Sequence, residues 1–238
     1  MEQRFNGEEK IGAIVAEYPG ASNLFKEVRI DFCCGGDRSL KQAIHQKNLD
    51  EHEIIRRLNE SYAAYINKSA LSDTDWRTAP VADLIDYIVD THHAYLRKEL
   101  PLLSEFLTKI LRVHGGGHPE IAALYKRFHL IKMELDEHLI AEEEVLFPKL
   151  KQLAEQPSAE TIERTIKELY ELEAEHSAVG DGLRDMREIT NDYALPPDAC
   201  RTYTLAYQKL AELESDLFQH IHLENNVLFP RALARRIQ

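Results

Sequence analysis

The chain has 238 residues, of which 44% are hydrophobic and 29% charged, proportions that are ordinary for soluble globular proteins. Asp and Glu number 41 against 29 Lys and Arg, and the resulting formal net charge of -12 disfavours a nucleic-acid partner because it repels phosphate backbones. No apolar run is long enough to span a membrane, and no signal-peptide pattern follows Met1. With only three cysteines, these features predict a cytoplasmic protein that has no membrane partner.

Short helical segments are predicted in the N-terminal part, residues 1–66. Ser39 is a suitable N-cap for a helix over 40–47, and the pair Asp50 and Glu53 has the spacing of a capping box that opens a second helix. A polar, turn-rich stretch over 67–80 follows. We therefore expect a small helical N-terminal domain and then a linker.

Helical periodicity dominates the remainder of the chain, residues 81–238. Breaks that contain Gly or Pro divide it into four segments, and no strand-like alternation is sustained. The predicted helices lie near 81–111, 119–153, 159–190 and 197–235. The fold prediction is all-α, with an antiparallel four-helix bundle over 81–238.

A His-x-x-x-Glu motif occurs in the second and again in the fourth of these helices. The first copy is His138 and Glu142, and the second is His220 and Glu224; Val-Leu-Phe-Pro follows each copy at the same distance. Residues four apart share a helix face, so we expect each pair to lie on an apolar face, with Val145 and Leu146 following on the first. Burying an imidazole beside a carboxylate is costly without compensation, and a bound metal ion would provide it.

The first and third helices each contribute one further inward histidine. His93 has apolar neighbours at four residues before it and at three and seven after it, and His176 has apolar residues at the same offsets. The flanking residues are Val89, Leu96 and Leu100 in the first helix and Leu172, Val179 and Leu183 in the third. The region thus reads as two copies of a helical hairpin, related by a quasi-twofold axis.

The six predicted ligands suit two metal ions better than one. They are His93, His138, Glu142, His176, His220 and Glu224. An isolated histidine on an apolar face is usually a packed or hydrogen-bonded residue. Two equivalent sets, each with two histidines and one glutamate, are poorly explained by coincidence. Six ligands exceed the three of a catalytic zinc site. If both carboxylates bridge, each ion receives two imidazoles, and an oxo or hydroxo bridge leaves one position open. Nitrogen and oxygen donors without thiolate favour iron or manganese.

The other histidines and the neighbouring acids are predicted to lie outside this site. His222 is two residues from His220 and should face away from the ligand face, and Glu143 and Glu144 should point away as well. Solvated or structural roles are expected for His45, His52, His92, His114, His118, His129 and His222.

The order of the six residues resembles that of the hemerythrin-like fold. The last acid is typically Asp in the oxygen-carrying members, and here it is Glu224. The segments 31–36 (Asp-Phe-Cys-Cys-Gly-Gly), 75–80 (Asp-Trp-Arg-Thr-Ala-Pro) and 223–233 extend the likeness, and the whole chain resembles the repair-of-iron-centres family of ScdA and YtfE type. The resemblance implies a non-haem di-iron protein, induced by nitrosative or oxidative stress, that restores damaged iron–sulfur clusters. It also implies that the family's iron ligands fall on the same six residues.

Two readings remain open for the adjacent cysteines Cys33 and Cys34. A disulfide between neighbours would strain the peptide, so a stable structural bridge is not expected, while a strained, reducible bridge stays open. The pair could simply form a tight turn with the two glycines that follow. The resemblance implies a thiol role instead, as a redox relay or a contact with the client cluster. Cys200 is predicted to be a small apolar residue.

Three functional classes are compatible with these features. The first is iron delivery from a labile di-iron site to damaged iron–sulfur proteins, which are then the partners. The second is an enzyme that reduces nitric oxide, and the third is a sensor that binds oxygen or nitric oxide. The sequence does not choose among them, and it leaves open whether the protein is an enzyme and whether it forms a homodimer.

Overall fold

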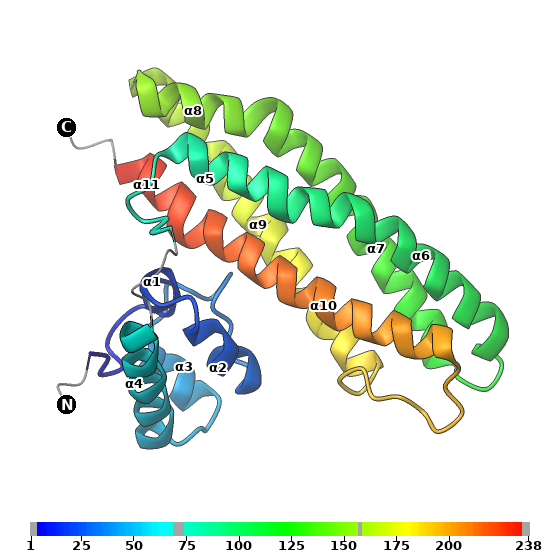
Figure 1. Ribbon diagram of the computed structural model, residues 1–238. Coiled ribbons are helices and arrows are strands. Elements are labelled where there is room, and N and C mark those ends of the chain that lie inside the picture. The colour runs from blue at the N-terminus through cyan, green and yellow to red at the C-terminus, as the bar shows by residue number, and fades with distance from the viewer. Residues whose placement is uncertain (1–3, 69–73, 157–158, 235–238) are drawn as a thin grey trace. The chain divides into compact units, whose positions relative to one another are not determined.

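The computed structural model describes residues 4–68, 74–156 and 159–234, and it is all-α, as predicted (Figure 1). Within these ranges the only β-type pairing is an isolated bridge between Lys10 and Ser39. The chain forms two compact units: Met1–Leu84 with Ile221–Gln238, and Ile85–His220. No helix among the described residues is both long and apolar enough to cross a bilayer.

Four helices make up most of the first unit. They are α1 (Ile11–Glu17), α2 (Ala21–Glu27), α3 (Leu40–Gln46) and α4 (Glu51–Lys68). The predicted cap of α3 is confirmed, because the Ser39 hydroxyl accepts the backbone N–H of Gln42 while the Gln42 side chain accepts the N–H of Ser39. Asp50 accepts the N–H of Glu53 at the start of α4. The core of this unit includes the fully buried Phe25, Phe32, Leu40, Ile44 and Leu58.

The predicted linker lies only partly within the described residues. Helix α4 extends into it as far as Lys68, and residues 69–73 are outside the described part of the chain. Residues 74–80 form a turn in which Thr78 N–H donates to the carbonyl of Asp75. The Arg231 guanidinium donates to the carbonyls of Trp76 and Ala79 and so ties this turn to the C-terminal segment. The division into domains at 1–66, 67–80 and 81–238 stays a prediction.

The four predicted bundle helices are present, and three of them contain a short π-helical segment. The first helical run is α5 (Val81–Ile88), η1 (Val89–His93) and α6 (Ala94–His114), and the second is α7 (Glu120–Ala141), η2 (Glu142–Leu146) and α8 (Phe147–Glu155). The third is α9 (Ala159–Ile189), and the fourth is α10 (Arg201–Leu223), η3 (Glu224–Leu228) and α11 (Phe229–Ala234). Residues 157–158 of one predicted break lie outside the described residues.

Large aliphatic and aromatic side chains fill the interior of the bundle. Helix α7 packs against both α6 and α9, and α8 packs against α9. Leu107, Phe128, Leu183 and Leu213 are completely buried, and each such side chain contributes about 1.5–3 kcal/mol relative to full exposure. This packing fixes the rotation of each helix about its axis and therefore decides which side chains face inward.

The π-helical segments change which residues face inward, and the sequence did not predict them. A π turn contains an additional residue, which rotates the helix beyond it by about 100° relative to an uninterrupted α-helix. Ile88 and His93, five residues apart across η1, are both 0% exposed. In η2, Leu146 is 2% exposed but Val145 is 46% exposed. The expectation that Val145 lies on the ligand face is therefore wrong.

Candidate metal centre

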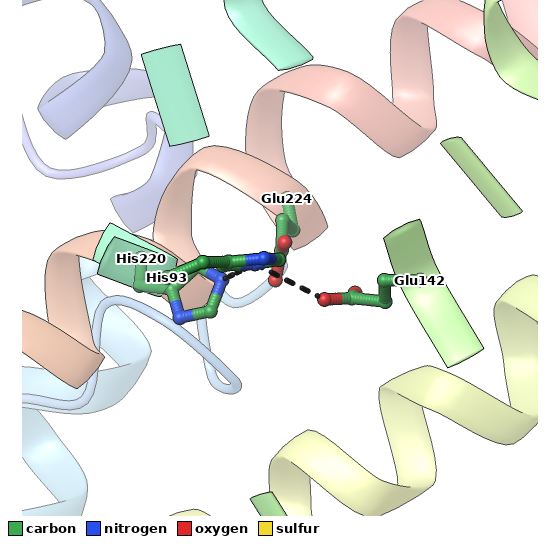
Figure 2. A group of neighbouring side chains, drawn as sticks. All are labelled: His93, Glu142, His220 and Glu224. Atoms are coloured by element: carbon green, nitrogen blue, oxygen red, sulfur yellow. Dashed lines mark hydrogen bonds and ion pairs between the residues drawn. The ribbon is translucent and has the colours of Figure 1, made fainter. Parts of the chain in front are cut away.

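Two groups of four buried side chains share both of the predicted carboxylates. The first group is His93, Glu142, His220 and Glu224 (Figure 2), and the second replaces the two histidines by His138 and His176. In each group, one potential ligand atom from every residue lies within 4.8 Å of the others. All six residues selected from the sequence are thus brought together.

The π-helical segments supply three of these six residues. His93 is the last residue of η1, and Glu142 and Glu224 are the first residues of η2 and η3. Glu224 lies four residues beyond His220 in the same uninterrupted helical run. Segments of π-helix are frequent at functional sites, where they redirect side chains that an α-helix would point elsewhere.

The distances between donor atoms suit two ions that share Glu142. Nε2 of His93 is 3.0 Å from Nε2 of His220, and Nε2 of His138 is 3.0 Å from Nε2 of His176. Two nitrogens bound to one ion at about 2.0–2.1 Å and near right angles are separated by a similar distance. The oxygens of Glu142 point to different groups: Oε2 is 3.4 Å from Nε2 of His93, and Oε1 is 3.3 Å from Nε2 of His138.

Burial and donor chemistry also fit a metal centre. Both carboxylates and His93 are 0% exposed, and the other three imidazoles are at most 5% exposed. Concentrating two anionic groups in the bundle interior is costly unless cations compensate them. Imidazole and carboxylate donors without thiolate suit iron or manganese. The six residues therefore fit a pair of such ions.

In each group, the Nδ1 atom of one imidazole, on the side of the ring opposite the other members of the group, contacts a carboxylate. Nδ1 of His93 lies 2.6 Å from a carboxylate oxygen of Glu143, and Nδ1 of His138 lies 2.7 Å from one of Glu175. Because an ionised carboxylate only accepts hydrogen bonds, Nδ1 is the donor and the lone pair on Nε2 is left for a metal ion. Each group thus contains an imidazole whose tautomer and orientation are fixed from outside.

The expectation that Glu143 points away from the site is therefore wrong. Its carboxylate also accepts a hydrogen bond from Arg97 at 2.6 Å. Burial raises the pKa of Glu143, but the hydrogen bonds from Arg97 and His93 outweigh it, and the net shift is downward. Glu143 stays ionised beside His93. Glu144 is exposed, as predicted.

His92 and His222 lie outside both groups, and both are buried. The Nδ1 atom of His92 is 2.9 Å from Asp216, and its ring stacks parallel to that of His220. His222 donates from Nδ1 to the carbonyl of Phe32 at 3.4 Å, and burial lowers the pKa of His222 to about 4. Of the two roles predicted for these histidines, the structural one applies.

The loop that carries the two cysteines is organised by Asp31. One Asp31 oxygen accepts the backbone N–H groups of Cys33 and Cys34 at 3.1 and 3.0 Å. The two cysteines are not joined by a disulfide, and their sulfur atoms are 3.7 Å apart. The Cys34 thiol, and then burial, raise the pKa of Cys33. The third cysteine, Cys200, is exposed, so the apolar role expected for it is wrong.

Asn226, which sequence reasoning missed, joins this loop to the segment that carries Glu224. Its side-chain amide donates to the carbonyls of Cys33 at 2.8 Å and Phe32 at 3.3 Å. A Cβ atom added to Gly12 or to Gly36 would lie 2.1 Å from Oδ1 of Asn226. A side chain at either position would therefore have to displace this amide.

Two family models match the chain. The one described as Hemerythrin HHE cation binding domain covers residues 84–232 and therefore includes all six residues of the two groups. The other, ScdA_N, is described as a Domain of Unknown function (DUF542) and covers residues 7–62. The second match contains both adjacent cysteines.

Curated relatives match along almost the full length of the chain. A protein of Citrobacter koseri named iron-sulfur cluster repair protein YtfE is 37% identical over 228 residues, which are 95% of this chain and 97% of the relative. A protein of Escherichia coli O157:H7 with the same name has the same identity and coverage. The order of the two matched regions is therefore common to this chain and these relatives.

Proposed function

Since the chain belongs to the family of hemerythrin-like iron–sulfur cluster repair proteins, we propose that it binds two non-haem iron ions and supplies iron to damaged iron–sulfur clusters. The observation that carries this proposal is the sharing of Glu142 and Glu224 by both groups of potential ligands. Two carboxylates common to two sets of imidazoles are the arrangement expected for a bridged pair of ions.

In this proposal the six residues divide between two adjacent ions. His93 and His220 bind one ion, His138 and His176 bind the other, and Glu142 and Glu224 bridge them. Bound iron would supply a redox-active ion that can be released to an acceptor. Glu143 and Glu175 hold His93 and His138 with Nε2 directed inward. The apolar surroundings of the ligands limit the access of water to them.

The number of anionic ligands favours release over permanent storage. Ferritin-like carboxylate sites use four carboxylates for two ions, whereas only two carboxylates are shared here. Fewer anionic donors stabilise ferric iron less and hold it less tightly. The outer carboxylate Glu175 has a side chain that is 56% exposed, so solvent reaches the hydrogen bond that orients His138. Breaking the hydrogen bond between Glu175 and His138 would free the His138 ring to rotate and so weaken its bond to the ion.

The test is a metal count on the full chain, followed by transfer to an acceptor. Iron is measured by mass spectrometry, and its pairing by Mössbauer spectroscopy. The loaded protein is then incubated with a protein whose iron–sulfur cluster has been damaged by nitric oxide. We expect about two irons per chain and a loss of iron that matches the iron gained by the acceptor. Glu142→Leu removes one of the two shared carboxylates, so the loaded variant should release its iron faster than wild type; Glu144→Leu is the matched control.

Nitric oxide reduction is the alternative that the same experiment separates. Two neighbouring ions could bind two molecules of nitric oxide, with electrons replaced by a reductant. Nitrous oxide formed in many turnovers, without loss of iron from the protein, would favour the enzyme and contradict iron supply. Stoichiometric loss of iron, without repeated gas formation, would support the repair proposal.

A further inference from the structure

A third group of potential ligands lies where two interhelical loops of the bundle meet. It consists of His114, the last residue of α6; His118, in the loop before α7; and Asp198, in the loop before α10. One ligand atom from each lies within 4.8 Å of the others. None of the three belongs to the groups that contain Glu142.

The position of His118 is fixed from both sides of its ring. Nε2 is 3.1 Å from both carboxylate oxygens of Asp198, and Nδ1 is 3.1 Å from a carboxylate oxygen of Glu120. A carboxylate on Nδ1 keeps that nitrogen as a donor, so the Nε2 lone pair would face an ion bound between His118 and Asp198. Glu120 thus contacts Nδ1 of His118 in the same way as Glu143 contacts Nδ1 of His93. Glu175 makes the equivalent contact with His138.

His114 is held next to His118 and has a buried nitrogen to satisfy. The backbone N–H of His118 donates to the carbonyl of His114 at 2.9 Å. The ring of the buried Tyr203 contacts both imidazoles edge-on, with centroid distances of 5.4 and 5.9 Å. Nε2 of His114 is buried and has no hydrogen-bond partner among the residues that the structure describes. Buried polar atoms of this kind are uncommon in folded proteins, and a bound cation would satisfy this one.

This group is remote from the proposed iron ligands of the same helical run. His114 follows His93 along η1 and α6, at a distance of about 30 Å for a rise of 1.5 Å per residue. An ion at His114 would therefore share no ligand with the di-iron centre.

We propose that His114, His118 and Asp198 bind a divalent cation of the zinc class. Two imidazoles and one carboxylate, with solvent as the fourth ligand, form a known type of tetrahedral zinc site. The exposure fits this assignment, because the side chains of His118 and Asp198 are 19% and 65% exposed and admit solvent. The ion cross-links the loop between α6 and α7 to the loop before α10.

The test measures zinc uptake by the full chain after its iron has been loaded. Wild type and the variants Asp198→Asn and His118→Ala are dialysed against Zn²⁺, and zinc and iron are counted together. We expect wild type to take up about one zinc more than either variant, with the same iron content in all three. His129→Ala is the matched control, because His129 lies in the same hairpin, bonded to Ser104 and Tyr125, and outside the group. It should take up as much zinc as wild type.

Equal zinc uptake by wild type and Asp198→Asn would overturn the proposal. Asp198 is exposed, so this variant should fold, and circular dichroism in the presence of a chelator checks that it does. Zinc should also raise the melting temperature of wild type and His129→Ala but not that of Asp198→Asn. Zinc uptake that occurs only as iron is lost would place the zinc in the di-iron site and would likewise contradict the assignment.

Discussion

Nδ1 of His93 lies 2.6 Å from the carboxylate of Glu143, the residue that directly follows Glu142 in η2. Glu142 and Glu143 therefore contact opposite nitrogens of the same His93 ring from one π turn. Oε2 of Glu142 is 3.4 Å from Nε2 of His93, and Glu143 contacts Nδ1. Arg97 holds Glu143 in place from α6. The orientation of a proposed ligand thus depends on an acid that is not itself a ligand.

Glu143→Leu should speed iron release to a chelator without removing a proposed ligand. The ring of His93 loses the carboxylate that fixes its tautomer, and losses of this kind commonly cost about ten- to a hundredfold in metal affinity. Release is followed by the absorbance of the chelator complex. Glu144→Leu, at the exposed next position, should release iron at the wild-type rate. Equal rates for the two variants would mean that the Glu143 contact does not support the site.

His220→Ala and His222→Ala should separate metal binding from stability. The first removes a proposed ligand and should lower iron to well under two per chain. The second removes the hydrogen bond to Phe32 and leaves a buried gap, at a cost of about 1–3 kcal/mol in the free energy of unfolding. It should retain its iron. Metal analysis and urea unfolding measure the two effects. If His222→Ala loses iron as severely as His220→Ala, the ligand assignment is wrong.

Gly12→Ala and Gly36→Ala should each destabilise the unit that contains the cysteine loop. The added methyl group would overlap the Asn226 side chain, and the overlap should cost about 1–3 kcal/mol. Gly116→Ala is the control, because no atom beyond its immediate chain neighbours lies within 4 Å of its added Cβ. Urea unfolding of the three variants measures the difference. An unchanged midpoint for both Gly12→Ala and Gly36→Ala would show that Asn226 is not held as described.

The three cysteines should react with iodoacetamide in the order Cys200, Cys34, Cys33. Cys200 is exposed, and the backbone N–H of Tyr203, followed by the His114 imidazole, lowers its pKa. The Cys34 thiol and burial raise the pKa of Cys33, so Cys33 has little thiolate at neutral pH. Mass spectrometry of the peptides against time gives the three rates. Labelling of Cys33 as fast as Cys200 would contradict the burial of that thiol.

Residue periodicity was sufficient to predict the helices and to select the six clustered residues. Both come from patterns within one helix, where spacing determines the face. The π segments were missed because the same spacing argument assumes an α-helix throughout, and Val145 and Glu143 were misplaced for that reason. Contacts between distant parts of the chain were also missed. Asn226 meets Gly12 and Gly36 only in the folded protein, and Asp198 reaches His118 across 80 residues of sequence.

The π turns at η1, η2 and η3 make the centre dependent on segment length as well as on residue identity. Each contributes an additional residue to a helix that otherwise follows the α repeat, so the apolar stripes before and after it are out of phase. On four ideal α-helices the motif would be kept, but the apolar residues before and after each π turn would no longer face the same interior. Deleting a single residue from η2 would rotate the apolar residues of α8 relative to those of α7, even if Glu142 and every neighbouring apolar residue were preserved.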